Sequence, residues 1–94
     1  MTLESQLELC AEHYKEWKQK AFEAIDAKNL PEGKKALERA FFWLELHSAF
    51  IMLNAVEQTN GKDPKVRNKI LIAKAHLSKK LANYANEVLE DIKL

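Results

Sequence analysis

The sequence predicts an all-α protein, in which three helices form an antiparallel up-down-up bundle within a single domain, residues 1–94. Only two glycines and two prolines occur, and they lie between segments whose apolar residues recur every three or four positions. No segment shows the alternation of apolar and polar residues that is typical of a β-strand. Short connections between long helices force neighbouring helices to run antiparallel.

The first helix is expected over residues 2–28. Thr2 is a favourable N-cap, and Glu4 and Glu8 place negative charge near the positive end of the helix dipole. The apolar residues form one stripe opposite a face of Glu, Lys and Gln, which is expected to be solvated. The stripe contains Leu3, Leu7, Cys10, Ala11, Tyr14, Trp17, Ala21, Ala24 and Ile25.

The second helix is expected over residues 30–58. Asn29 is the predicted cap and Pro31 falls in the first turn, where its missing N–H costs nothing. After the helix, Asn60 or Gly61 is expected to take the left-handed conformation common at helix C-termini.

The third helix is expected over residues 63–93, because Asp63-Pro64 combines a cap with a proline at the first helical position. Its main apolar stripe contains Val66, Ile70, Ala73, Leu77, Leu81, Tyr84, Val88 and Ile92. A second, weaker line holds Leu71, Ala75, Ala82 and Leu89, whose small members would let another backbone come close.

Residues 41–56 are the most apolar part of the chain, and in a helix they form two apolar faces. One face contains Phe41, Leu44, Ile51, Met52 and Ala55. The other face is the predicted protein interface, consisting of Phe42, Trp43, Leu46, Ala49, Phe50 and Leu53. A helix with two apolar faces must be covered from two directions, so we expect a homodimer that forms a larger helical bundle, or another helical protein as partner. The alternative is a flat monomer in which the outer helices cover the two faces.

Basic residues dominate the start of the third helix, which suggests a face that contacts phosphates. The residues proposed for nucleic-acid contact are Lys65, Arg67, Lys69, Lys74, Lys79 and Lys80. The acidic residues of the first helix offer another explanation, since they balance this charge within the bundle or across a dimer. No aromatic residue is interleaved for base stacking, so nucleic-acid binding is the less favoured function.

Metal and cofactor chemistry are not expected. Cys10, His13, His47 and His76 are weak candidates for zinc ligands, because the three histidines fall at similar heights in an antiparallel bundle. Glu45 lies in the most apolar segment, where we expect partial burial, but a buried Glu in a bundle is more often paired with a Lys or Arg of a neighbouring helix than catalytic. The sequence therefore predicts no catalytic residue, no metal and no cofactor.

Composition and charge favour a small non-enzymatic interaction or scaffold protein. The formal net charge is +1, so no global field draws the chain to nucleic acid or a membrane. A single cysteine favours a reducing compartment, and the first residues lack the pattern of a signal peptide. Residues 41–56 are too short and too interrupted by polar residues to span a bilayer. We therefore expect a cytoplasmic protein without a membrane partner.

Overall fold

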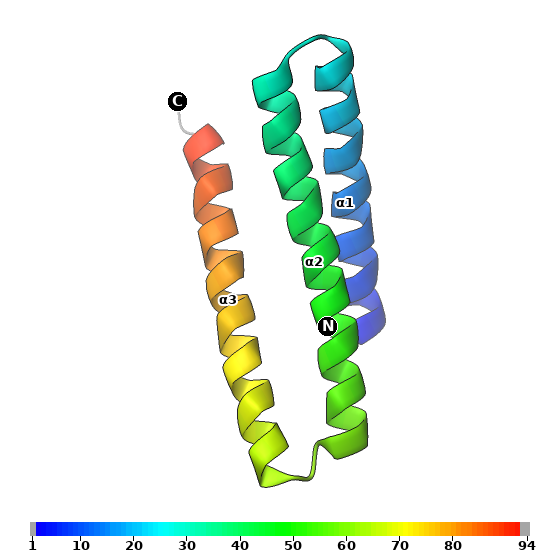
Figure 1. Cartoon of the computed structure of the whole chain (residues 1–94), viewed down its shortest axis with the longest axis vertical. Coiled ribbons are helices and arrows are strands. Elements are labelled where there is room, and N and C mark those ends of the chain that lie inside the picture. Colours follow the sequence, from blue (N-terminus) through cyan, green and yellow to red (C-terminus); the bar gives the residue numbers. More distant parts are fainter. Residues whose placement is uncertain (1, 93–94) are drawn as a thin grey trace. The chain divides into compact units, whose positions relative to one another are not determined.

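The computed structural model describes residues 2–92, which are almost entirely α-helical and contain no β-strand. The helices are α1 (Leu3–Asp26), α2 (Leu30–Asn60) and α3 (Pro64–Ile92), shown in Figure 1. The predicted all-α class is confirmed, and the predicted helix starts and ends lie close to these bounds. The end expected at residue 93 lies outside the described residues.

The chain divides into two compact units, Met1–Met52 and Leu53–Leu94. The first unit contains α1 and most of α2, whereas the second contains the end of α2 and α3. The single domain expected over residues 1–94 stays a prediction.

Each of these helices begins at a side-chain cap that the sequence predicts. A side-chain oxygen accepts a hydrogen bond from a backbone N–H of the first turn: Thr2 from Ser5 at 3.2 Å, Asn29 from Glu32 at 3.4 Å and Asp63 from Lys65 at 3.0 Å. These bonds satisfy N–H groups that have no partner within the helix.

Lys28 has a left-handed conformation, with a φ of 62°, and lies directly after α1. The N–H of Asn29 donates to the carbonyl oxygen of Ala24 at 2.8 Å, and the N–H of Lys28 donates to that of Ile25 at 2.9 Å. This pair of bonds is the Schellman motif, which requires a left-handed residue at the position of Lys28. The left-handed conformation expected at Asn60 or Gly61 is wrong, since neither residue has a positive φ.

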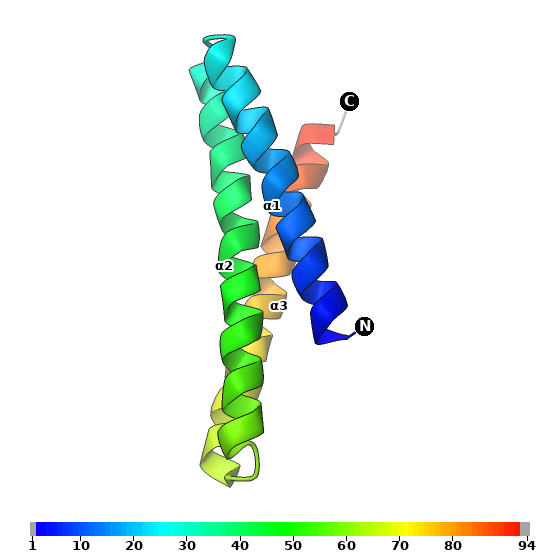
Figure 2. The same ribbon diagram turned by 90° about the vertical axis from the view of Figure 1, so that its right-hand side faces the viewer.

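In the first unit, α1 runs antiparallel beside α2 (Figures 1 and 2). A Cβ added to Gly33 would lie 2.8 Å from Cγ1 of Ile25 and 3.6 Å from the carbonyl oxygen of Ala21. The two helices therefore approach closely at this point, and small side chains make that approach sterically feasible. The buried residues of this unit are mostly small and include Cys10, Ala21, Gly33, Ala36 and Ala40.

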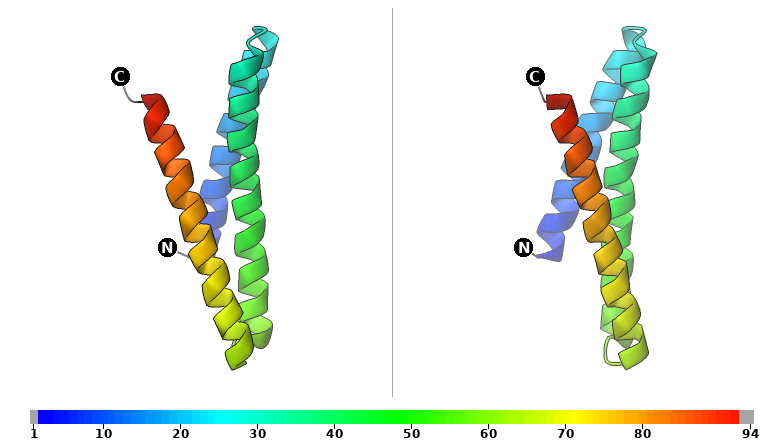
Figure 3. Two further views of the ribbon diagram at one scale, coloured as in Figure 1. Left: turned by 60° about the vertical axis from the view of Figure 1, so that its left-hand side comes forward. Right: turned by 90° about the vertical axis from the view of Figure 1, so that its left-hand side faces the viewer.

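In the second unit, α3 folds back along the end of α2 after a short turn (Figure 3). The N–H of Asp63 donates to the carbonyl oxygen of Asn60 at 3.1 Å and closes this turn. On α3, Ile70 is buried, and most of the predicted main stripe is half-buried. The second line of α3 is exposed: Leu71, Ala75, Ala82 and Leu89.

Candidate functional site

The interface residues predicted from sequence lie on the less exposed side of α2. The ring of Trp43 stacks on that of His13 in α1, with 4.4 Å between ring centroids, and Phe42 packs edge-on against Trp43 at 5.3 Å. Leu46 is only 4% exposed, so it is inaccessible to a second molecule in this conformation, contrary to its predicted role. The remaining residues of the set are half-buried: Phe42, Trp43, Ala49, Phe50 and Leu53. Their role in an interface stays a prediction.

The other apolar face of α2 is the exposed one. Large apolar side chains on this face retain much of their accessible surface: Phe41 56%, Leu44 43%, Ile51 45% and Met52 67%. In an α-helix these positions share one side, because at 100° per residue they fall within an arc of about 100°. We call Phe41, Leu44, Ile51 and Met52 the exposed α2 face. Exposed large apolar side chains gathered on one side of a helix are candidates for an interaction site.

A cavity of about 390 Å³ in the first unit is lined in part by Trp17 and Arg39. The Arg39 guanidinium carbon lies 4.9 Å from the centroid of the Trp17 ring, and Nζ of Lys20 lies 4.4 Å from it. Arg39 is only 8% exposed, so its stacking on Trp17 occurs largely out of water, where a cation–π contact is strongest. Glu23 and Glu32 also line the cavity, which therefore carries both signs of charge.

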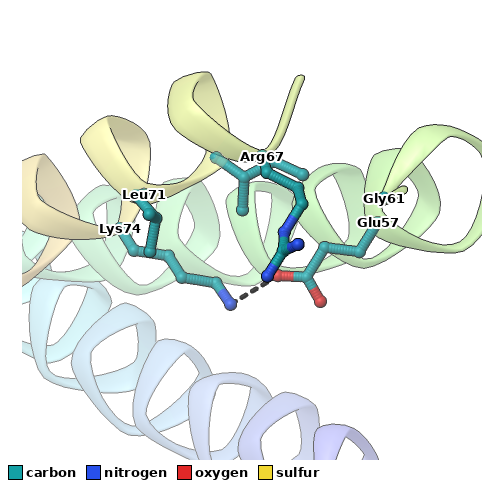
Figure 4. Close-up of a pocket in the computed structure, with 6 residues that line it drawn as sticks. Glu57, Gly61, Arg67, Leu71 and Lys74 are labelled. Atoms are coloured by element: carbon teal, nitrogen blue, oxygen red, sulfur yellow. Dashed lines mark ion pairs between the residues drawn. The ribbon is translucent and has the colours of Figure 1, made fainter. Parts of the chain in front are cut away.

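The second unit contains a cavity of about 370 Å³ with an ion pair at its side (Figure 4). Nζ of Lys74 on α3 pairs with a carboxylate oxygen of Glu57 on α2, and the side chain of Arg67 points toward the same carboxylate. Both paired side chains are substantially exposed, 54% for Lys74 and 40% for Glu57. Water screens such a pair, so its contribution to stability is small.

The basic residues proposed for nucleic-acid contact are all exposed: Lys65, Arg67, Lys69, Lys74, Lys79 and Lys80. They do not form a uniform positive surface, because Lys74 is paired with Glu57. The acidic residues expected to balance them are also exposed, and they all lie on α1: Glu4, Glu8, Glu12, Glu16, Glu23 and Asp26.

Two of the four weak zinc candidates, His13 and Cys10, have other environments in the structure, whereas His47 is half-buried and His76 is exposed. His13 stacks on Trp43 and lies 3.6 Å from a carboxylate oxygen of Glu16. Cys10 is buried, and this burial raises the pKa of its thiol. Within residues 2–92, no group of three or more His, Cys, Asp or Glu side chains is arranged to hold a metal ion. Glu45 is exposed, so its expected burial is wrong.

Comparison with known proteins gives no relative from which a role could be transferred. No family model, no curated protein and no solved structure matches the chain. Among the described residues, no helix combines the length and the apolar character needed to cross a membrane. We therefore infer a function from the surfaces of the chain itself.

Two features of the first unit were not predicted from the sequence. Gly33, Ala36 and Ala40 recur at three- and four-residue spacing, which signals close helix packing, yet none of the three was predicted to be in the core. The stacking of Arg39 on Trp17 joins residues far apart in sequence, and nothing in their local pattern indicates it.

Proposed function

We propose that this chain acts by binding protein, as a small non-enzymatic scaffold that associates with a second copy of itself through α2. The exposed α2 face is the single observation that carries this proposal, because leaving four large apolar side chains in water is unfavourable. A two-fold homodimer that forms a larger helical bundle covers this face in the simplest way. The free, buried Cys10 is consistent with a reducing compartment such as the cytoplasm.

This proposal uses a different face of α2 from the one predicted by the sequence. The predicted set includes Leu46, which is buried, and Trp43, which already contacts His13. The exposed α2 face provides more accessible apolar surface, because its four large side chains are each at least 43% exposed.

Sedimentation velocity over the micromolar range tests this proposal. The wild-type chain should sediment as a dimer, and Phe41→Glu should weaken association at least tenfold, because a buried unpaired carboxylate costs more than about 1.4 kcal/mol. Circular dichroism should show unchanged helicity, since Phe41 is 56% exposed within the chain.

Phe22→Glu is the matched control, since Phe22 on α1 is similarly exposed at 53% and lies outside the face. Phe50→Glu distinguishes the two faces of α2: if the face predicted from sequence mediates association, Phe50→Glu dissociates the dimer and Phe41→Glu does not. A wild-type chain that stays monomeric throughout would refute self-association.

A second candidate function is nucleic-acid binding by the basic residues of α3. The observation that favours it is the exposure of every proposed contact residue, from Lys65 to Lys80. Its test is binding to a DNA duplex as a function of salt concentration, because each neutralised phosphate steepens the loss of affinity. Absence of binding at low salt would eliminate this candidate.

A further inference from the structure

Three residues of the exposed α2 face, together with Ser48, have the spacing of a coiled-coil seam. Phe41, Leu44, Ser48 and Ile51 follow one another at alternating steps of three and four residues, which is the spacing of heptad a and d positions. All four side chains are exposed, and three of them are large and apolar. The face therefore presents protruding side chains in regular layers.

The second line of α3 has the same spacing but contains small residues. We call it the α3 seam, and it consists of Leu71, Ala75, Ser78, Ala82, Ala85 and Leu89. Every member is exposed, with Leu71 at 65% and Leu89 at 62%. Small side chains flanked by longer ones form the holes into which a facing helix inserts its side chains.

The exposed α2 face and the α3 seam complement each other in size when the two helices run antiparallel. In one register the layers are Phe41 with Ala85, Leu44 with Ala82, Ser48 with Ser78 and Ile51 with Ala75. Phe41, Leu44 and Ile51 then each meet an alanine. Two α2 faces together would place large side chains opposite large ones, whereas two α3 seams would leave space unfilled.

Charge favours the same pairing. Glu38 and Glu45 lie along one edge of the exposed α2 face, and both are exposed. Lys79 lies along the edge of the α3 seam and is also exposed. The register that aligns the layers also places Glu45 beside Lys79, at the flanking positions where charges select coiled-coil partners. Two α2 faces would instead bring like charges together, which is unfavourable.

We propose that the α3 seam of a second copy covers the exposed α2 face, with the two helices antiparallel. The contact is reciprocal, so each copy receives the partner's α3 seam on its α2 and provides its own α3 seam in return. This assignment rests on the proposed self-association and identifies the α3 seam as the surface that packs against the exposed α2 face.

A complementary exchange of side-chain size tests the assignment. Leu44→Ala leaves a gap and Ala82→Leu creates a clash, so each variant alone should dimerise at least tenfold more weakly than the wild-type chain. In an equimolar mixture, the two variants can form a mixed dimer. One of its two contacts places the shortened side chain at position 44 of the first variant against the enlarged side chain at position 82 of the second. The other contact keeps the wild-type pair of Leu44 and Ala82. The mixed dimer should therefore recover to within a few-fold of wild-type affinity, measured by sedimentation of differently labelled chains.

Asn83→Leu is the matched control, because it adds a leucine side chain at an exposed position of α3 outside the seam. A second exchange, Ile51→Ala with Ala75→Leu, repeats the test in another layer if either first variant loses helicity. A monomeric wild-type chain would refute self-association as a whole. A wild-type dimer that tolerates Ala82→Leu, or variants that weaken without recovery on mixing, would overturn only the assignment to the α3 seam.

Discussion

The imidazole ring of His13 stacks on the indole ring of Trp43, with centroids 4.4 Å apart and an angle of 26° between the ring planes. The contact joins α1 to α2 within the first unit. Two ring systems in this arrangement contribute beyond the area that they bury, by about 0.5–1.5 kcal/mol. The stack therefore contributes to holding the two helices together.

A double-mutant cycle on His13 and Trp43 measures this contribution. Trp43→Ala should lower the free energy of unfolding by about 3 kcal/mol, because it removes a large half-buried side chain. His13→Ala should cost less, and the coupling energy in urea unfolding should be about 1 kcal/mol. Purely additive losses would show that the rings are neighbours without energetic coupling.

Lys28→Gly should stabilise the chain by about 1 kcal/mol. Lys28 has a φ of 62°, and this conformation is unfavourable for a residue with a Cβ by about 1–2 kcal/mol. Glycine removes that strain, and part of the gain is offset because it increases the entropy of the unfolded chain. Thermal unfolding checks the result, with Lys28→Ala as control, which removes the same side chain and keeps the strain. Equal stability of the two variants would contradict the explanation.

The helix starts could be predicted from sequence, whereas this helix end could not. Thr2, Asn29 and Asp63 are residue types that cap helices through their own side chains, so local chemistry identifies them. Lys28 carries no such signal, because its conformation is imposed by the backbone bonds of the turn. Gly61 is the residue type that favours a left-handed helix end, yet it has no positive φ.

The two apolar faces of α2 could also be predicted, but not which of them is buried. Phe41 and Phe50 are equally apolar, and hydropathy cannot rank them. The small residues Gly33, Ala36 and Ala40 are the parts of α2 that allow close helix packing, and they are all buried. Their position fixes the orientation of α2 within the first unit, and therefore leaves Phe41 exposed.

The thiol of Cys10 should react slowly in the folded chain. Cys10 is 1% exposed, and burial raises the pKa of its thiol, so both access and the thiolate fraction are reduced. Iodoacetamide at neutral pH should modify Cys10 far more slowly in buffer than in urea. Equal rates would mean that the first unit opens readily around Cys10.

Cys10 should also make stability depend on alkaline pH. The unfolded chain releases the thiol proton around the ordinary pKa of 9.0, and the folded chain holds it to higher pH. The folded state then binds more protons, so this contribution is fully present below about pH 9 and is lost as pH rises further through the raised pKa. Cys10→Ala should lose less stability over that range in urea unfolding. Parallel pH profiles for the two chains would refute the effect.

Arg39→Lys should destabilise the first unit by about 1 kcal/mol although the charge is kept. Arg39 stacks a planar guanidinium on Trp17 while it is only 8% exposed, and an ammonium group cannot reproduce that geometry. Arg67→Lys is the control, because Arg67 is exposed and should tolerate the change. Urea unfolding of both variants checks the prediction, which fails if they lose equal stability.

The charges of α3 oppose the dipole of their own helix. Its first turns carry Lys65, Arg67 and Lys69, and its last described turns carry Glu87, Glu90 and Asp91. A helix dipole is positive at the N-terminus and negative at the C-terminus, so the basic group and the acidic group each lie at the end where their charge is unfavourable. The Asp63 cap has the opposite effect and stabilises the N-terminus. Consequently moderate salt, which screens charges, should strengthen α3.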